Sequence, residues 1–223
     1  MCRRGGERHL AQPRNIIEYE PGALLREWGL HGLEAELVDV LVGGPPCQAF
    51  ARVGRAKLRE VASHPGAYLK DPRGDLCLRF LHYVRELQPV ALLMENVPDV
   101  LNYGGHNIAD EMCEVLSELG YNCRYTFLNA AFYGVPEMRE RVFLLAYAQE
   151  VGSSPAFPEC THYVRLPRGY DGSRQVAMQT IDTGLFADQV YFTHSPVPDA
   201  SAASRPLTAW DPLADLPPVF IGN

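Results

Sequence analysis

Two short segments of the sequence carry side chains that could do chemistry together. One reads GGPPCQ at residues 43–48 and holds Cys47, and the other reads ENVP at residues 95–98 and begins with Glu95. A thiol near a carboxyl group suits a reaction in which the thiolate is the nucleophile and the carboxyl group holds or donates a proton. Each residue taken singly has an ordinary explanation, as a small buried cysteine or a solvated surface acid. The prolines beside both residues stiffen the two segments and favour the catalytic interpretation.

Both segments follow apolar runs that predict buried strands. Residues 37–42 predict a strand that ends in the first segment, and residues 90–94 predict a strand that ends in the second. In an open parallel sheet, the loops at the carboxyl ends of the strands form the active crevice. If the two strands are neighbours, Cys47 and Glu95 project from the same edge of the sheet.

Further elements alternate with these strands. Apolar spacing predicts a helix over residues 74–88 and another over residues 108–119, closed by Gly120 as its C-cap. Residues 121–128 and 141–147 predict two strands that a short, turn-rich stretch connects, and we expect this pair to be antiparallel. The pattern predicts an α/β fold, a parallel sheet with a C-terminal antiparallel strand pair.

The pattern of the chain changes near residue 149. Half of the 18 prolines lie beyond that point, and helical periodicity disappears there. We expect residues 1–148 to form a catalytic domain and residues 149–223 to form a proline-rich irregular segment. A length of 223 residues suits one domain of ordinary size that buries a proper core.

Composition and charge exclude several classes of protein. A hydrophobic content of 47% with 21% charged residues fits a globular chain. No apolar run reaches the roughly 20 residues of a membrane span, so we expect a soluble, cytoplasmic protein without a membrane partner. The net charge of −7 argues against a nucleic-acid binder held by phosphate attraction alone. The six cysteines form no Cys-x-x-Cys pair, so we expect reduced thiols and no metal site.

Four motifs resemble, in order, those of the cytosine-C5 DNA methyltransferases. The string GGPPCQAF at residues 43–50 resembles the family's catalytic loop, and ENV at residues 95–97 resembles its second catalytic motif. The string YGVPEMRER at residues 133–141 resembles the Gln-x-Arg-x-Arg motif, with Glu137 in place of the glutamine. The string DPRGDL at residues 71–76 matches the segment that opens the helix between the two catalytic loops.

The resemblance implies part of the Rossmann-like fold of S-adenosylmethionine-dependent methyltransferases and a specific reaction. A methyl group would pass from S-adenosyl-L-methionine to carbon 5 of a cytosine flipped out of double-stranded DNA. By this resemblance, Cys47 attacks carbon 6 of the base and forms a covalent intermediate. Glu95 would hold or protonate nitrogen 3, and Arg141 would hold oxygen 2. Arg139 would support the loop or contact a phosphate.

The residues after the nucleophile are candidate DNA contacts. Five polar or basic residues lie at positions 48–59: Gln48, Arg52, Arg55, Lys57 and Arg59. The four basic residues would clamp the backbone of the flipped strand, although a charged surface loop explains them equally well. Double-stranded DNA is the partner that the resemblance implies, and a cognate restriction endonuclease is a second.

The resemblance also implies a binding site for the methyl donor. Pro46 and Leu76 fall where family members line the adenosyl pocket, and Asn15 falls where the family has an aspartate beside the adenine. The family's glycine-rich donor loop, Phe-x-Gly-x-Gly, does not occur in the sequence, and residues 206–217 resemble the stretch that leads into the family's target-recognition domain. We therefore expect that these 223 residues alone neither bind the donor at micromolar concentration nor methylate DNA.

Two functions stay open from the sequence. The first is a DNA (cytosine-5-)-methyltransferase, and the second is a catalytically inactive fragment or DNA-contacting partner subunit of such an enzyme. An RNA-modifying relative is disfavoured, because the RNA-directed branch does not usually carry the Pro-Pro-Cys-Gln form of the loop.

Overall fold

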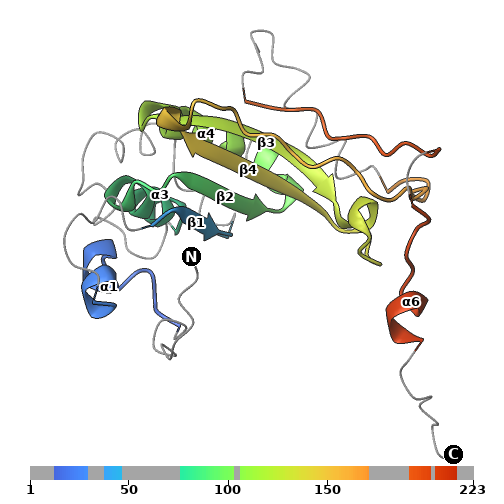
Figure 1. Cartoon of the computed structure of the whole chain (residues 1–223), viewed down its shortest axis with the longest axis horizontal. Helices are drawn as coiled ribbons and strands as arrows, with labels where there is room; N and C mark the ends of the chain where they lie inside the picture. The colour runs from blue at the N-terminus through green and yellow to red at the C-terminus, as the bar shows by residue number, and fades with distance from the viewer. Residues whose placement is uncertain are drawn as a thin grey trace, which may run out of the picture.

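The computed structural model describes residues 13–29, 38–46, 76–102, 106–170, 191–201 and 204–214. Within these residues, four strands form one mixed sheet in the order β1-β2-β4-β3 (Figure 1). The strands are β1 (Val40–Gly43), β2 (Ala91–Asn96), β3 (Tyr121–Asn129) and β4 (Glu140–Ala148). Six of the predicted site residues lie outside the described residues: Cys47, Gln48, Arg52, Arg55, Lys57 and Arg59.

Helices connect and flank these strands. The α-helices are α1 (Pro21–Glu27), α3 (Leu76–Leu87), α4 (Ile108–Glu118) and the short α6 (Trp210–Leu213). Three 3₁₀ turns complete the described elements: η5 (Pro98–Asn102), η6 (Ala130–Tyr133) and η7 (Gln149–Val151). Among the described residues, no helix is long and apolar enough to cross a membrane.

Strand pairing confirms the expectation on which the site depends. β1 and β2 are parallel neighbours, with Gly43 opposite Met94, so the chain leaves both strands at the same edge of the sheet. β3 and β4 are antiparallel, as predicted. β1 starts at Val40, later than the apolar run suggests, and Val40 pairs with Ala91, the first residue of β2.

α3 and α4 cover one face of this sheet (Figure 1). Side chains of β2 alternate between buried and half-buried, as expected for a strand with one covered face. Leu92 and Met94 point into the core against the helices, and Glu95 points to the opposite, open face. The strand pattern thus leaves the predicted proton donor accessible while its neighbours build the core.

The end of α4 differs in detail from the prediction. Leu119 is the C-cap residue, and Gly120 follows it with a φ of +90°. This left-handed conformation favours glycine. Gly120 is therefore the residue after the C-cap and not, as predicted, the C-cap itself.

One part of the proline-rich region packs on the sheet. The amide of Tyr125 donates to the carbonyl of Tyr191, and the amide of Thr193 donates to the carbonyl of Tyr125, both at 2.9 Å. Phe192, between these two contacts, is 9% exposed and joins the core. The sequence analysis did not foresee this contribution to the core, and the domain boundary near residue 149 remains a prediction.

Candidate active site

Two of the predicted catalytic residues form an ion pair on the open face of the sheet. Nε of Arg141 lies 3.0 Å from Oε1 of Glu95. Glu95 stands opposite Phe143 in the antiparallel pairing of β2 and β4, so Arg141 is its diagonal neighbour on the same face. The side chains are 41% exposed for Glu95 and 21% exposed for Arg141, and both groups therefore remain accessible to a ligand.

Asn96 ties the loop that leads to Cys47 to the end of β2. Its side chain is buried, and Nδ2 donates to the carbonyl of Pro45 at 2.8 Å. Gly44 also lies close to this strand, since a Cβ at Gly44 would stand 3.6 Å from both the carbonyl and Oε2 of Glu95. The residues just before the predicted nucleophile are therefore fixed beside the predicted proton donor. Asn96 follows Glu95 directly, but no local sequence signal predicts its contact with the first loop.

A cavity of about 310 Å³ opens beside this ion pair. Its walls combine three charged side chains with apolar groups, and the lining residues are Glu95, Leu128, Ala130, Tyr133, Arg139, Arg141, Phe143 and Pro158. Burial raises the pKa of Tyr133 above its usual range. An apolar cavity with a few convergent charged groups is the usual form of a small-molecule or base pocket.

Arg139 lines the same cavity but is more exposed than Arg141. Its Nη1 lies 3.6 Å from Oε1 of Glu137, a pair in which both side chains are about half exposed. Its backbone carbonyl accepts from the amide of Ala130 at 2.9 Å, which closes the loop between β3 and β4. Glu137 thus contacts Arg139 in the place where the resembled motif has glutamine.

The proline-rich region braces this loop from outside. The hydroxyl of Tyr133 donates to the carbonyl of Pro158 at 2.9 Å. The hydroxyl of Tyr170 donates to the carbonyl of Met138 at 2.7 Å, next to Arg139. Pro158 and Tyr170 carry no sequence signal for such a role, because both act through contacts between distant segments.

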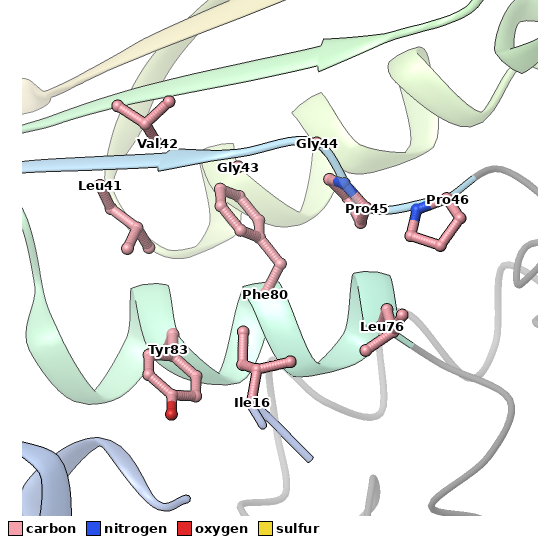
Figure 2. A pocket seen from close by; sticks show the side chains of 10 residues that line it. All are labelled: Ile16, Leu41, Val42, Gly43, Gly44, Pro45, Pro46, Leu76, Phe80 and Tyr83. Atoms are coloured by element: carbon pink, nitrogen blue, oxygen red, sulfur yellow. The ribbon is translucent and has the colours of Figure 1, made fainter. Parts of the chain in front are cut away.

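A second cavity, of about 230 Å³, lies between α3 and the loop that follows β1 (Figure 2). Pro46 and Leu76, two of the predicted donor-binding residues, both line it, and Figure 2 shows Phe80 reaching from α3 toward Gly43. A Cβ at Gly43 would stand 2.6 Å from the ring of Phe80, so only glycine allows this close approach. Ile16 supplies a wall from the N-terminal segment.

Asn15, the third predicted donor-binding residue, is not in the lining of this cavity. Its Oδ1 accepts from the amide of Ile17 at 3.1 Å, and its Nδ2 donates to Oε1 of Glu18 at 2.7 Å. The side chain closes a local turn, while the next residue, Ile16, reaches the cavity. A contact between Asn15 and a bound ligand therefore stays a prediction.

Comparison with known proteins agrees with the family resemblance of these motifs. A family model, the C-5 cytosine-specific DNA methylase, matches residues 28–180, well over half of the chain. The chain belongs to the C-5 cytosine-specific DNA methylase family. The match includes both catalytic segments and the loop between β3 and β4.

Individual relatives agree with this assignment. A type II methyltransferase from Oceanobacillus iheyensis is 34% identical over 185 residues, which cover 81% of this chain and 38% of the relative. A type II methyltransferase from Picosynechococcus sp. is 38% identical over 133 residues, covering 56% of this chain and 49% of the relative. The chain thus spans less than half the length of these curated relatives.

Among solved structures, a DNA modification methyltransferase encoded within an E. coli prophage overlaps with 64% of this chain and 35% of its own. The sequence identity is 22% and the TM-score is 0.45. At this level of likeness the overlap adds nothing to the family assignment, which rests on the family model.

Proposed function

We propose that this chain carries the catalytic residues of a DNA (cytosine-5-)-methyltransferase, which moves a methyl group from S-adenosyl-L-methionine to carbon 5 of a cytosine flipped out of double-stranded DNA. The 3.0 Å pair of Glu95 and Arg141 carries the proposal, because it brings two of the expected base-binding groups together in one cavity. Asn96 adds support by fixing the loop that leads to Cys47 beside this pair.

In this proposal each catalytic side chain acts on a different atom of the base. The thiolate of Cys47 attacks carbon 6, and the new bond makes carbon 5 nucleophilic. Once the pair with Arg141 has opened, the protonated form of Glu95 donates a hydrogen bond or a proton to nitrogen 3, which withdraws electron density from the ring and favours the attack. Arg141 holds oxygen 2, and Arg139 holds the loop or a phosphate. After carbon 5 carries the methyl group, a water molecule takes the proton from carbon 5. The electron pair left there re-forms the 5,6 double bond, and Cys47 departs as a thiolate.

The cavity beside α3 fits the adenosyl part of the donor. Leu76, Phe80 and Ile16 give it flat or branched apolar walls, and the absence of a Cβ at Gly43 keeps the strand backbone close to the ring of Phe80. Such walls suit a heteroaromatic ring. Pro46 lines this cavity one residue before Cys47, so a donor held there would lie next to the nucleophile's loop. When bound, S-adenosyl-L-methionine supplies the methyl group as an electrophile.

The proposed partners follow from this function. Double-stranded DNA is the substrate, and Gln48, Arg52, Arg55 and Lys57 are the proposed contacts to it. The names of the two relatives, both type II methyltransferases, favour a cognate restriction endonuclease as a second partner. We place the reaction in the cytoplasm.

Product analysis tests the function directly. The test uses a protein in which these residues are joined to a donor loop and a target-recognition domain, which we call the full-length protein. It is incubated with DNA and methyl-labelled S-adenosyl-L-methionine. The DNA is then hydrolysed to nucleosides for mass spectrometry. We expect label in 5-methyl-2′-deoxycytidine. Label only in N4-methylcytosine or N6-methyladenine would contradict the proposal, because neither product needs attack at carbon 6.

A further inference from the structure

A buried arginine on α3 holds the segment that forms one wall of the cavity beside α3. Arg79 is 4% exposed, and no step of the proposed reaction uses it. Its Nε donates to the carbonyl of Ile16 at 2.6 Å, and its Nη1 lies 3.0 Å from Oε1 of Glu20. Its Nη2 donates to the carbonyl of Tyr19. One guanidinium therefore contacts three residues of a segment that is distant in sequence.

Two further side chains of α3 hold the same segment. Nε2 of His82 lies 2.9 Å from Oε2 of Glu20, and the hydroxyl of Tyr83 donates to the carbonyl of Tyr19 at 2.7 Å. Positions three and four residues apart lie on one face of a helix, so Arg79, His82 and Tyr83 act from the same side. We call these three residues the α3 clamp.

The buried guanidinium of Arg79 needs hydrogen-bond acceptors and an opposite charge. A buried guanidinium is stable only when its N–H groups are hydrogen-bonded and its charge is paired. Arg79 meets both requirements through backbone carbonyls and the carboxylate of Glu20. The rigid fork of arginine can reach all three acceptors at once, whereas a lysine ammonium at the same place could not.

The α3 clamp also determines where a cavity wall stands. Ile16 and Tyr83 both line the cavity (Figure 2). Arg79 binds the carbonyl of Ile16 directly. We propose that Arg79 is a positioning residue for the methyl donor: it holds Ile16 against the cavity and thereby sets the affinity for S-adenosyl-L-methionine. This inference rests on the proposed function, since it takes that cavity as the donor site.

A ligand titration with a second, ligand-free readout tests the inference. The 223-residue chain is labelled on isoleucine methyl groups and titrated with S-adenosyl-L-methionine to millimolar concentration, which detects weak binding by NMR. We expect the Ile16 methyl signal to shift, and we expect the dissociation constant to rise at least ten-fold in Arg79→Ala and in Arg79→Lys. Arg85→Ala removes a charge from the same helix outside the α3 clamp and should change the constant less than two-fold.

Hydrogen exchange shows separately whether Arg79 holds the segment. The amides of Ile17, Glu18 and Tyr19 are hydrogen-bonded to Asn15, and we expect them to lose protection in Arg79→Ala. Amides of α4 should stay protected, which confirms a folded variant. If Arg79→Ala does not fold, Glu20→Gln replaces it in the test. This variant removes the ion pair with Arg79 at a half-exposed side chain. It should raise the dissociation constant for S-adenosyl-L-methionine at least two-fold.

The outcomes separate this inference from the function on which it rests. A folded Arg79→Ala variant with unchanged affinity would overturn the inference, whatever its exchange pattern. A wild-type chain whose Ile16 methyl does not respond to the donor would overturn both the donor cavity and the inference. Methyl transfer by the full-length protein in that case would show that the function stands and that the donor binds elsewhere.

Discussion

Glu95 and Arg141 meet at 3.0 Å across the antiparallel strands β2 and β4, on the face of the sheet that α3 and α4 leave open. A partly exposed ion pair of this kind contributes little to folding, because water screens it and ordering the side chains offsets the attraction. Each of the two side chains can leave the other and bind a polar atom of a base instead. The proposed function gives the pair a role in binding the base, which its small contribution to stability leaves open.

The first prediction separates these two roles of Glu95. Glu95→Gln in the full-length protein should lower the rate of methyl transfer in a single turnover by roughly 100- to 10,000-fold, the usual range for loss of a general acid or base. Its free energy of unfolding in urea should change by less than about 1 kcal/mol. Asp99→Asn, an exposed acid just beyond β2, is the matched control and should change neither quantity. A Glu95→Gln enzyme of normal rate would contradict the assigned role.

The second prediction concerns the bond between Asn96 and Pro45. Asn96→Ala leaves the Pro45 carbonyl without this donor and should lower the free energy of unfolding by about 1–3 kcal/mol. Asn122→Ala, which loses an exposed bond of 3.3 Å to Ser153, is the control and should stay within about 0.5 kcal/mol. Denaturation in urea measures both. Equal, small effects would show that Asn96 does not fix the loop.

The third prediction is a loss of stability at high pH. Burial, together with nearby Cys123, raises the pKa of Tyr121 to about 12, and its hydroxyl donates to the carbonyl of Pro89 at 2.8 Å. Because the folded-state pKa lies above the ordinary tyrosine value of about 10, the stabilisation is complete below pH ~10 and declines as the pH rises toward ~12. In Tyr121→Phe, the free energy of unfolding should fall less between pH ~10 and pH ~12, by on the order of 2 kcal/mol. Denaturation in urea at several pH values measures this difference. An equally steep decline in the variant would contradict the assignment.

The sequence correctly predicted β1 and β2 and the position of their carboxyl ends at one edge of the sheet, for a physical reason. Apolar runs and turn residues mark β1 and β2 locally, and short-range rules place the ends of parallel neighbours at one edge. The motif order then indicated Glu95 and Arg141, and the structure brings those two together.

Other parts of the site had no local signal. Arg79 is a charged residue on an apolar helix face, and only its contacts with a distant segment explain its burial. Pro158 and Phe192 lie in a region whose composition indicates irregular chain, yet one lines a cavity and the other joins the core. Such long-range packing depends on the whole fold and not on the spacing of neighbouring residues.

Covalent trapping tests the central claim most directly. DNA that carries 5-fluorocytosine is incubated with the full-length protein and S-adenosyl-L-methionine. Fluorine at carbon 5 cannot leave as a proton does, so the sulfur–carbon bond should persist. We predict a denaturant-resistant protein–DNA adduct that Cys47→Ser abolishes and that Cys160→Ser, a change at a half-buried cysteine whose pKa burial raises, leaves intact. An adduct that forms equally well with Cys47→Ser would contradict the account.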